Sequence, residues 1–417
     1  MANLSPRDTQ TIVKHEILES YLTRWGNIII NGLRGPYLKA RNRGGSFRVR
    51  FVYVDCFAHK GRYSAGRNTR DIVPGSPLIG ISELEKVSES ARTTAGFTPE
   101  VFAILIEKDK SIYQDLLDTL EWAGLANRIR ETSDFSTLRS GEIATVCGDY
   151  RDFAADLLTF TSAPYTWSFY LLDPYGPLGI PLDVVARIVG QDRADVMINF
   201  PYQDLHKKTG SVVRGTQEHG LHLQYYDELY GDRNWRNIAT DYLDTPDEME
   251  TRLVQEYIRS LQSTDESLAI KLVPLKFPDK ERTMFYLFLT THDPTGGLAM
   301  NEILDDAKLR EHNLRIQWKD EKFQESSGGV LPQVMPGFGD HMGLVPNVPA
   351  RPSKDVIADH IYELCRGEVI EYREVLRRLV NETYHHDEIR SAMSLLKRQK
   401  RAQYTELRNP EIVSFTP

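Results

Sequence analysis

The stretch "FVYVDCFAHKGRY", residues 51–63, joins an apolar run to a polar turn. The run from Phe51 to Val54 consists of β-branched and aromatic residues, which is typical of a strand buried on both faces of a sheet. It ends at Asp55, and the turn that follows contains one glycine, Gly61. A buried strand followed by such a turn predicts the first strand of an open α/β sheet, in which ligands bind where the strands end.

Further runs of the same type recur along the chain, with helical patterns between most of them. Residues 11–32 have apolar side chains close to helical spacing and predict an amphipathic helix packed on the main domain. Alternating strands and helices indicate a doubly wound, mostly parallel α/β sheet. The other predicted strands lie within 100–109, 142–150, 167–176, 194–202 and 282–294, and predicted helices include 111–129 and 181–189.

Composition excludes several classes of protein. The 417 residues are 41% hydrophobic and 26% charged, as in a globular protein, and the net charge of −8 excludes a polycation that coats nucleic acid. No apolar run approaches the roughly 20 residues of a membrane span, and the start "MANLSPRDTQ" lacks the apolar stretch of a secretion signal. We therefore expect a cytoplasmic protein without membrane contact. Cys56, Cys147 and Cys365 lie far apart, which predicts buried hydrophobic side chains rather than disulfides or a metal site.

Four predicted strands end in an acidic residue. Asp55, Glu107, Asp149 and Asp173 follow the apolar runs of four different strands. Because parallel strands end at one edge of the sheet, we expect these carboxylates to lie near one another. A carboxylate at the end of the second strand is the usual acceptor for the paired hydroxyls of a ribose, and Glu107 has that place.

The turn "DCFAHKGR" resembles the DxFxGxG loop of class I S-adenosylmethionine-dependent methyltransferases. His59 and Lys60 stand at its first glycine and the residue after it, and histidine tolerates a left-handed conformation better than a β-branched residue does. Without the resemblance, the stretch is a strand end with a solvated lysine and a structural glycine. The resemblance implies S-adenosylmethionine as cofactor, bound by Asp55, Phe57, His59, Lys60, Gly61, Glu107 and Asp149.

The segment "LLDPYG" resembles the Asp-Pro-Pro-aromatic turn of nucleic-acid amino methyltransferases. In such a turn the acid accepts hydrogen bonds from the target amine and the aromatic ring stacks on a flipped base. The corresponding catalytic candidates are Asp173, Pro174 and Tyr175. An ordinary β-turn with proline at its second position is the alternative.

Several motifs in order resemble one family. They are "KHEIL" with Trp25, "YVDCFAHKGRY", "GSPLIG", "IEKD", "LLDPYG", "INF" and "LYGDRNW". From about Thr11 to Trp318 the chain resembles the three-Cys-motif partner proteins, bacterial companions of a three-cysteine, radical-SAM-like protein. The resemblance implies a Rossmann-like methyltransferase fold and such a partner. The chain departs from the family's glycine-containing loop at His59 and Lys60, which favours a remodelled cofactor loop.

The C-terminal part forms a separate unit in the sequence. We divide the chain into a methyltransferase-type domain at 1–325, a Gly/Pro-rich linker at 326–352 and a module at 353–417, whose three short helical patterns and strand-turn-strand ending predict a winged helix-turn-helix. A recognition helix with a basic wing would contact nucleic acid, although such modules also bind proteins and basic residues also complement a helix dipole. The candidate nucleic-acid contacts are Arg390, Lys397, Arg398, Lys400 and Arg401.

These features support more than one function. The first hypothesis is a methyltransferase-like enzyme that binds S-adenosylmethionine or a related nucleotide, with the C-terminal module delivering nucleic acid. The second is a catalytically degenerate scaffold or specificity subunit that binds nucleic acid or a partner protein. A third is a different reaction with His59 or Lys60 as acid or base. Arg214, Trp235 and His292 are further substrate-site candidates, with surface charge, core filling and turn capping as alternatives.

Overall fold

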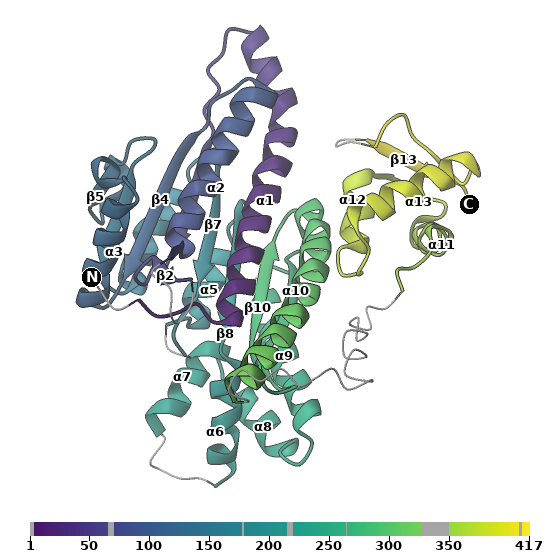
Figure 1. Ribbon diagram of the computed structural model, residues 1–417. Helices are drawn as coiled ribbons and strands as arrows, with labels where there is room; N and C mark the ends of the chain where they lie inside the picture. The colour runs from purple at the N-terminus through teal and green to yellow at the C-terminus, as the bar shows by residue number, and fades with distance from the viewer. Residues whose placement is uncertain are drawn as a thin grey trace.

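The computed structural model shows an α/β domain with a helical module beside it (Figure 1). For residues 211–214, 220–222 and 323–326 it describes the backbone only. The described residues are 4–65, 71–176, 179–214, 220–263, 265–326, 350–407 and 411–417.

An 8-stranded sheet forms the centre of the domain, in the order β5-β6-β4-β1-β7-β8-β10-β9. The strands from β5 to β8 in this order are parallel, whereas β10 is antiparallel to both β8 and β9. The sheet is therefore mostly parallel, as the sequence predicts. Its strands are β1 (Arg50–Asp55), β4 (Glu100–Glu107), β5 (Ile129–Glu131), β6 (Ile143–Cys147), β7 (Thr166–Leu172), β8 (Ala194–Phe200), β9 (Ala269–Lys276) and β10 (Thr283–Thr291).

Helices cover both faces of the sheet, because the central strands are apolar on both sides. On one face, Phe51 and Tyr53 of β1 pack with α1, α2, α3 and α10. The predicted N-terminal helix is α1, which is longer than expected and begins after Asp8, whose side chain accepts from Thr11 N–H at 2.6 Å. The helices of this face are α1 (Thr9–Asn42), α2 (Ser76–Ser90), α3 (Lys110–Trp122) and α10 (Pro294–Ser326).

The opposite face packs Val52 and Val54 against a second set of helices. Three of them, α6, α7 and α8, lie below the sheet in Figure 1. The helices of this face are α4 (Ala154–Thr161), α5 (Leu182–Val189), α6 (Tyr202–Arg214), α7 (Gly220–Tyr230), α8 (Asn234–Asp241) and α9 (Pro246–Gln262). A 3₁₀ turn, η4 (Tyr150–Phe153), precedes α4, and the small hairpin of β2 (Arg62–Ser64) and β3 (Ile72–Pro74) follows β1.

The edge strand β9 is absent from the sequence prediction, although its pattern is visible in the sequence. Its residues alternate between buried and half-buried positions, because one side of the strand faces the core. Pro274 lies in it opposite Tyr286 of β10, which fits an edge strand that needs fewer ladder hydrogen bonds.

The C-terminal module contains three helices and a small sheet. Its elements are α11 (Lys354–Cys365), β11 (Val369–Glu371), α12 (Tyr372–Leu379), α13 (His386–Arg398), β12 (Ala402–Gln403) and β13 (Ile412–Phe415), and the strands pair in the order β11-β13-β12. Its hydrophobic core also includes Leu298 of α10, so the module packs on the main domain. The helix α10 runs to Ser326, the first residue of the predicted linker, and residues 327–349 of that linker lie outside the described residues.

The structure also bears on the expectations about membrane spans, metal ligands and cysteines. In the described part of the chain, no helix is long and apolar enough to cross a membrane. Among the same residues, no group of His, Cys, Asp and Glu side chains is placed to hold a metal ion. Cys56 and Cys365 are buried, as expected, but Cys147 is exposed. The prediction for Cys147 was wrong because β6 ends there, at the open edge of the sheet.

Candidate functional site

Asp55, the last residue of β1, faces the protein interior. Its side chain is fully buried and accepts hydrogen bonds from the Tyr53 hydroxyl at 3.1 Å and from Phe57 N–H at 3.2 Å. Burial raises the pKa of Asp55 to about 7. Both oxygens of this predicted cofactor ligand are thus engaged inside the fold.

The turn after β1 contains two residues with a left-handed backbone. His59 has φ of 49° and Gly61 has φ of 69°, so both are left-handed. A Cβ atom on Gly61 would lie 3.1 Å from Leu116, which explains why the last glycine is needed. The His59 side chain is exposed at this edge.

Lys60, the next residue of the turn, is paired with a helix of the main domain. Its ammonium forms an ion pair with Asp115 of α3 at 2.9 Å, and its carbonyl accepts from the Thr119 hydroxyl at 2.6 Å. The charge of Lys60 is thus compensated by a carboxylate of the neighbouring helix, and about a quarter of its side chain is exposed, 26%. Its assignment as a cofactor contact stays a prediction.

Phe57 fills space between two turns. Its ring lies 5.4 Å from that of Tyr150, and a Cβ atom on Gly179 would come within 2.9 Å of it. Gly179 has φ of 111°, so the chain after β7 passes closely over the Phe57 ring. Phe57 thus holds together the loops that follow β1 and β7.

Glu107, the last residue of β4, joins two backbone segments. One carboxylate oxygen accepts from His59 N–H at 2.9 Å and the other from Asp109 N–H at 2.8 Å. Only 9% of the residue is exposed. Because a carboxylate oxygen has two lone pairs, each oxygen retains one acceptor position. Glu107 is thus the predicted cofactor ligand that still has acceptor positions to offer.

Asp149 follows β6 and is paired with two cations. Arg151 donates to it at 2.8 and 2.6 Å, and Lys108 at 3.0 Å. The hydrogen bonds from Arg151 hold the pKa of Asp149 well below its ordinary value. The position at the edge of the sheet is as predicted, but the charge is compensated within the protein.

Asp173 follows β7 and meets a lysine from the N-terminal helix. Lys14 Nζ donates to its two oxygens at 2.9 and 2.6 Å, and the Asn199 amide donates at 2.6 Å. Lys14 also lies 5.1 Å from the centre of the Phe285 ring. Lys14 lies in the segment "KHEIL", and no sequence signal links it to Asp173, because the two residues are 159 positions apart.

The other two residues of the Asp-Pro-Tyr turn lie in different environments. Pro174 is buried, whereas the Tyr175 side chain is completely exposed. Among the described residues, the Tyr175 ring therefore makes no ring or hydrogen-bond contact. Asp173 is bound to a cation, and by the same count of lone pairs its Oδ2 atom retains one acceptor position.

The second histidine near this edge is buried and neutral. His15 is 6% exposed, its ring lies 5.6 Å from that of Tyr63, and burial lowers the pKa of His15 to about 3. Its Nδ1 atom and the Oδ1 atom of Asn199 are buried and have no hydrogen-bond partner in the described structure. These two atoms mark incompletely satisfied positions beside Asp173.

These contacts allow a test of the cofactor that the sequence implies. S-adenosylmethionine requires free acceptors for its ribose and ammonium groups and free amides in the first loop. Glu107 offers acceptors, but Phe57 N–H and His59 N–H already donate within the protein. Asp149 and Asp173 are paired with cations. Glu107 therefore remains available to a cofactor, whereas Asp149 and Asp173 would contact one only beside the cations that they already bind.

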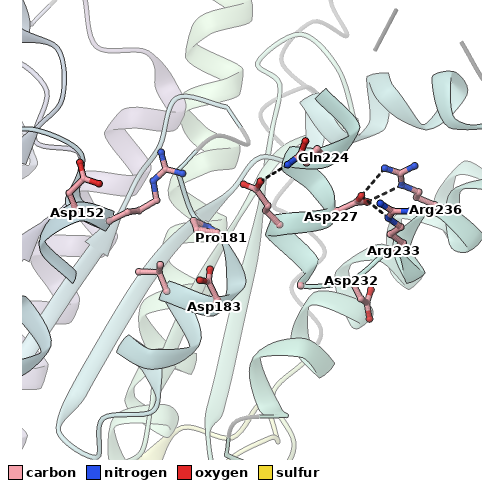
Figure 2. Close-up of a pocket in the computed structure, with 12 residues that line it drawn as sticks. Asp152, Pro181, Asp183, Gln224, Asp227, Asp232, Arg233 and Arg236 are labelled. Carbon is pink, nitrogen blue, oxygen red and sulfur yellow. Dashed lines mark hydrogen bonds and ion pairs between the residues drawn. The ribbon is translucent and has the colours of Figure 1, made fainter. Parts of the chain in front are cut away.

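A groove of about 1000 Å³ lies beside this edge, between η4, α5, α7 and α8 (Figure 2). Asp227 lines this groove and is held by three side chains. It accepts from Trp235 Nε1 at 3.0 Å, from Arg236 at 2.9 and 2.8 Å and from Arg233 at 3.2 Å. Trp235 is fully buried, so core filling is its role. The Arg214 side chain lies outside the described residues, and His292 lies elsewhere, at the opposite edge of the sheet.

The five basic candidates of the C-terminal module divide into two groups. Lys397 lies 4.5 Å from the Tyr404 ring centre, and Arg401 pairs with Asp359 at 2.6 Å. In the part of the chain that the structure describes, the other three side chains are exposed and have neither an ion pair nor a hydrogen bond. They are Arg390, Arg398 and Lys400.

Comparisons with known proteins do not identify a family for this chain. No family model matches the sequence, and no curated protein matches it. Among solved structures, the chain is similar to protein LPL1258 from Legionella pneumophila str. Philadelphia 1, described with the family DUF519. The two are 11% identical, the match covers 69% of this chain and 86% of the other, and the TM-score is 0.35. A similarity this weak carries no argument, so the function must be argued from the residues themselves.

Proposed function

We propose that this protein binds nucleic acid through its C-terminal module and that the methyltransferase-type domain serves as a scaffold. The observation that carries the proposal is the unpaired basic surface of Arg390, Arg398 and Lys400. Ser391 and Ser394 lie exposed on the same helix, α13, and are suited to hydrogen bonds with phosphate or base edges.

The order of the elements supports this assignment of the module. Helix, strand, two helices and two strands, with β13 between β11 and β12, is the arrangement of a winged helix-turn-helix. In it, α13 is the recognition helix. Its apolar stripe, Ile389, Ala392, Met393 and Leu396, is buried against the module, which leaves the basic side outside.

The order of the sheet supports the methyltransferase-type domain. From β6 to β9 the strands follow the order of class I methyltransferases, in which one antiparallel strand lies between the last two parallel ones. The compensated carboxylates favour a scaffold over an enzyme, since Asp55, Asp149 and Asp173 all have partners within the fold.

The test compares two triple variants of the full chain on a short labelled DNA duplex. Replacing Arg390, Arg398 and Lys400 by Ala should weaken binding and reduce the slope of log affinity against log salt by about 0.9 for each phosphate that is no longer neutralised. The matched control, Arg390→Lys, Arg398→Lys and Lys400→Arg, keeps the charge and should retain binding. Unchanged affinity and salt slope in the alanine variant would contradict the proposal.

A second candidate function is a methyltransferase-like enzyme that binds S-adenosylmethionine or a related nucleotide and acts with a three-cysteine, radical-SAM-like partner. The acceptor positions of Glu107 and the left-handed turn at His59 favour it. Calorimetry with S-adenosylmethionine and S-adenosylhomocysteine on the chain alone tests this candidate. Saturable binding that Glu107→Ala abolishes would support it, and no heat with either ligand would reject it.

A further inference from the structure

Buried and partly buried hydrogen bonds fix the C-terminal module to the main domain. Lys271 Nζ and Asn301 Nδ2 both donate to the Glu382 carbonyl at 2.9 Å, and Asn301 also donates to the Tyr384 carbonyl at 2.7 Å. Lys271 and Asn301 are 8% and 7% exposed. A Cβ atom on Gly297 would lie 2.5 Å from Val380, so the two surfaces touch closely. A cavity between them is therefore preformed.

Such a cavity, of about 520 Å³, lies at the edge of the sheet opposite the acidic strand ends. Its walls come from α1, the starts of β7 and β8, the junction of β10 with α10, and α12 of the module. This volume is in the range of small-molecule sites, which are often found between two packed units. Neither the nucleic-acid proposal nor the acidic edge uses this cavity.

One side of the cavity is cationic. Arg373 and Arg377 lie one turn apart on α12, and Arg193 comes from the start of β8. Arg373 lies 3.7 Å from Asp293, whereas Arg377 pairs with Glu374 on its own helix at 2.8 Å. About half of each α12 side chain is exposed, 45% and 49%. Three arginines thus line one cavity, and guanidinium groups suit the recognition of a phosphate.

Aromatic rings form a wall next to these cations. Trp167 is half-buried, and the Arg193 guanidinium lies 5.4 Å from its ring centre. Trp25 and Tyr21 are almost fully buried behind it. A planar group would stack on Trp167 while its phosphate meets Arg193.

The remaining wall supplies hydrogen-bond acceptors. Asp192 and Asp265 line the cavity, together with His292, whose ring lies 2.6 Å from the Val189 carbonyl and 3.3 Å from Asp265. Behind them, the buried Asp195 accepts from the Tyr21 hydroxyl at 2.5 Å and from the Thr291 hydroxyl at 2.8 Å. Acceptors of this kind suit the exocyclic and ring N–H groups of a nucleobase.

We propose that this cavity binds a nucleoside monophosphate, with the phosphate on Arg193, Arg373 and Arg377 and the base between Trp167 and the Asp192–Asp265 side. A ligand with an anion at one end and donors on a flat group at the other matches all three walls. A simple anion would bind the arginines but would be repelled by the carboxylates of the cavity. A polyamine would bind the carboxylates but would be repelled by the arginines. The inference does not rest on the proposed contact of α13 with nucleic acid.

The experiment is calorimetric titration of the full chain with AMP, GMP, CMP and UMP, followed by tryptophan fluorescence. At least one nucleotide should bind saturably, and Arg193→Ala and Arg377→Ala should each weaken binding roughly tenfold, as expected for removal of a charged hydrogen bond. Trp167→Phe should remove most of the fluorescence change. The matched control, Arg366→Ala, changes an exposed arginine of the module that lies outside both the cavity and the proposed nucleic-acid surface, and it should leave nucleotide binding unchanged.

Three results would overturn the proposal. They are no saturable binding of any of the four nucleotides, equal binding by the arginine variants and the wild type, or inorganic phosphate binding as tightly as the nucleotides. Arg193→Lys and thermal unfolding of each variant distinguish a weakened site from a misfolded protein, since the lysine variant should retain part of the affinity. The DNA duplex should still bind Arg193→Ala, so failure here and failure of the nucleic-acid proposal are distinguishable.

Discussion

At the scale of single residues, the acidic strand ends show how far a sequence pattern determines a site. Asp55, Glu107, Asp149 and Asp173 lie at or just after the ends of their strands as predicted, and all four accept hydrogen bonds within the protein. Lys14 is a donor that the pattern does not contain. It comes from a helix far away in the sequence and neutralises Asp173, with 14% and 25% of the two side chains exposed.

The Lys14–Asp173 pair gives a prediction about stability. Lys14→Met should lower the free energy of unfolding by roughly 1–3 kcal/mol, because it leaves a largely buried carboxylate without a cation. Adding Asp173→Asn should recover most of that stability, since an amide needs no counter-charge. Urea unfolding measures both effects.

The matched control is Lys108→Met, which removes a lysine paired with Asp149 but 72% exposed. This change should lower the free energy of unfolding by less than about 1 kcal/mol. If the Lys14 and Lys108 variants are destabilised equally, or if Asp173→Asn gives no recovery, Asp173 does not depend on Lys14 in the way the geometry indicates.

At the scale of elements, local patterns predict the buried strands and miss the amphipathic ones. The central strands are continuous apolar runs, so β1 and β7 stand out in the sequence. β9 has a weaker alternating pattern interrupted by Pro274. α6 to α9, between residues 202 and 262, have no apolar run to mark them and were not predicted. Their burial depends on the sheet face that they cover.

The contact between α1 and α2 gives a prediction at this scale. A Cβ atom on Gly26 of α1 would lie 2.2 Å from Val87 of α2, whereas nothing lies within 4 Å of one on Gly32. Alanine improves helix propensity by about 1 kcal/mol at either position. Gly32→Ala should therefore stabilise the protein by up to about 1 kcal/mol.

Gly26→Ala should instead destabilise the protein by about 1–2 kcal/mol, because overpacking outweighs the gain in propensity. Thermal or urea unfolding measures the stability of both variants, which lie on the same helix. Stabilisation by Gly26→Ala would show that α1 and α2 do not pack as closely as the structure indicates.

At the scale of the whole molecule, two buried carboxyl groups link stability to pH. Burial raises the pKa of Asp55 and of Asp195 from 3.8 to about 7. Between these values the folded protein binds protons that the unfolded chain does not, so each group favours folding as the pH falls from about 7 to about 4. His15 acts in the opposite direction, because the pKa of its buried ring is lowered to about 3.

A variant isolates one of these contributions. Asp195→Asn removes the titration, and the amide can still accept from Tyr21 or Thr291. The stability of the wild type relative to the variant should rise by up to about 1.4 kcal/mol per pH unit as the pH falls from about 7 to about 4. Urea unfolding at several pH values measures it, and a difference that is constant with pH would contradict a raised pKa at Asp195.

The attachment of the C-terminal module is also a property of the whole molecule. Asn301→Ala should loosen the α12–α13 turn, because two buried carbonyl groups then have no donor from this side chain. Amide hydrogen exchange in α12 and α13 should then become faster. Asn313→Ala, at an exposed position of the same helix, is the control and should change nothing. Unchanged exchange in Asn301→Ala would mean that other contacts hold the module.

The sequence by itself determined the class of sheet, its central strands, the position of acids at their ends and the three helices of the C-terminal module. These are local features, since an apolar run or a helical period needs only neighbouring residues. The tertiary structure alone decided what the acids do and where the arginines lie. Lys14 pairs with Asp173, and Lys60 pairs with Asp115. Arg373 and Arg377 of α12 line the same cavity as Arg193. Such pairings depend on distances across the fold. "FVYVDCFAHKGRY" accordingly specified a strand and its turn, while the helices around it decided which of its charges remain free.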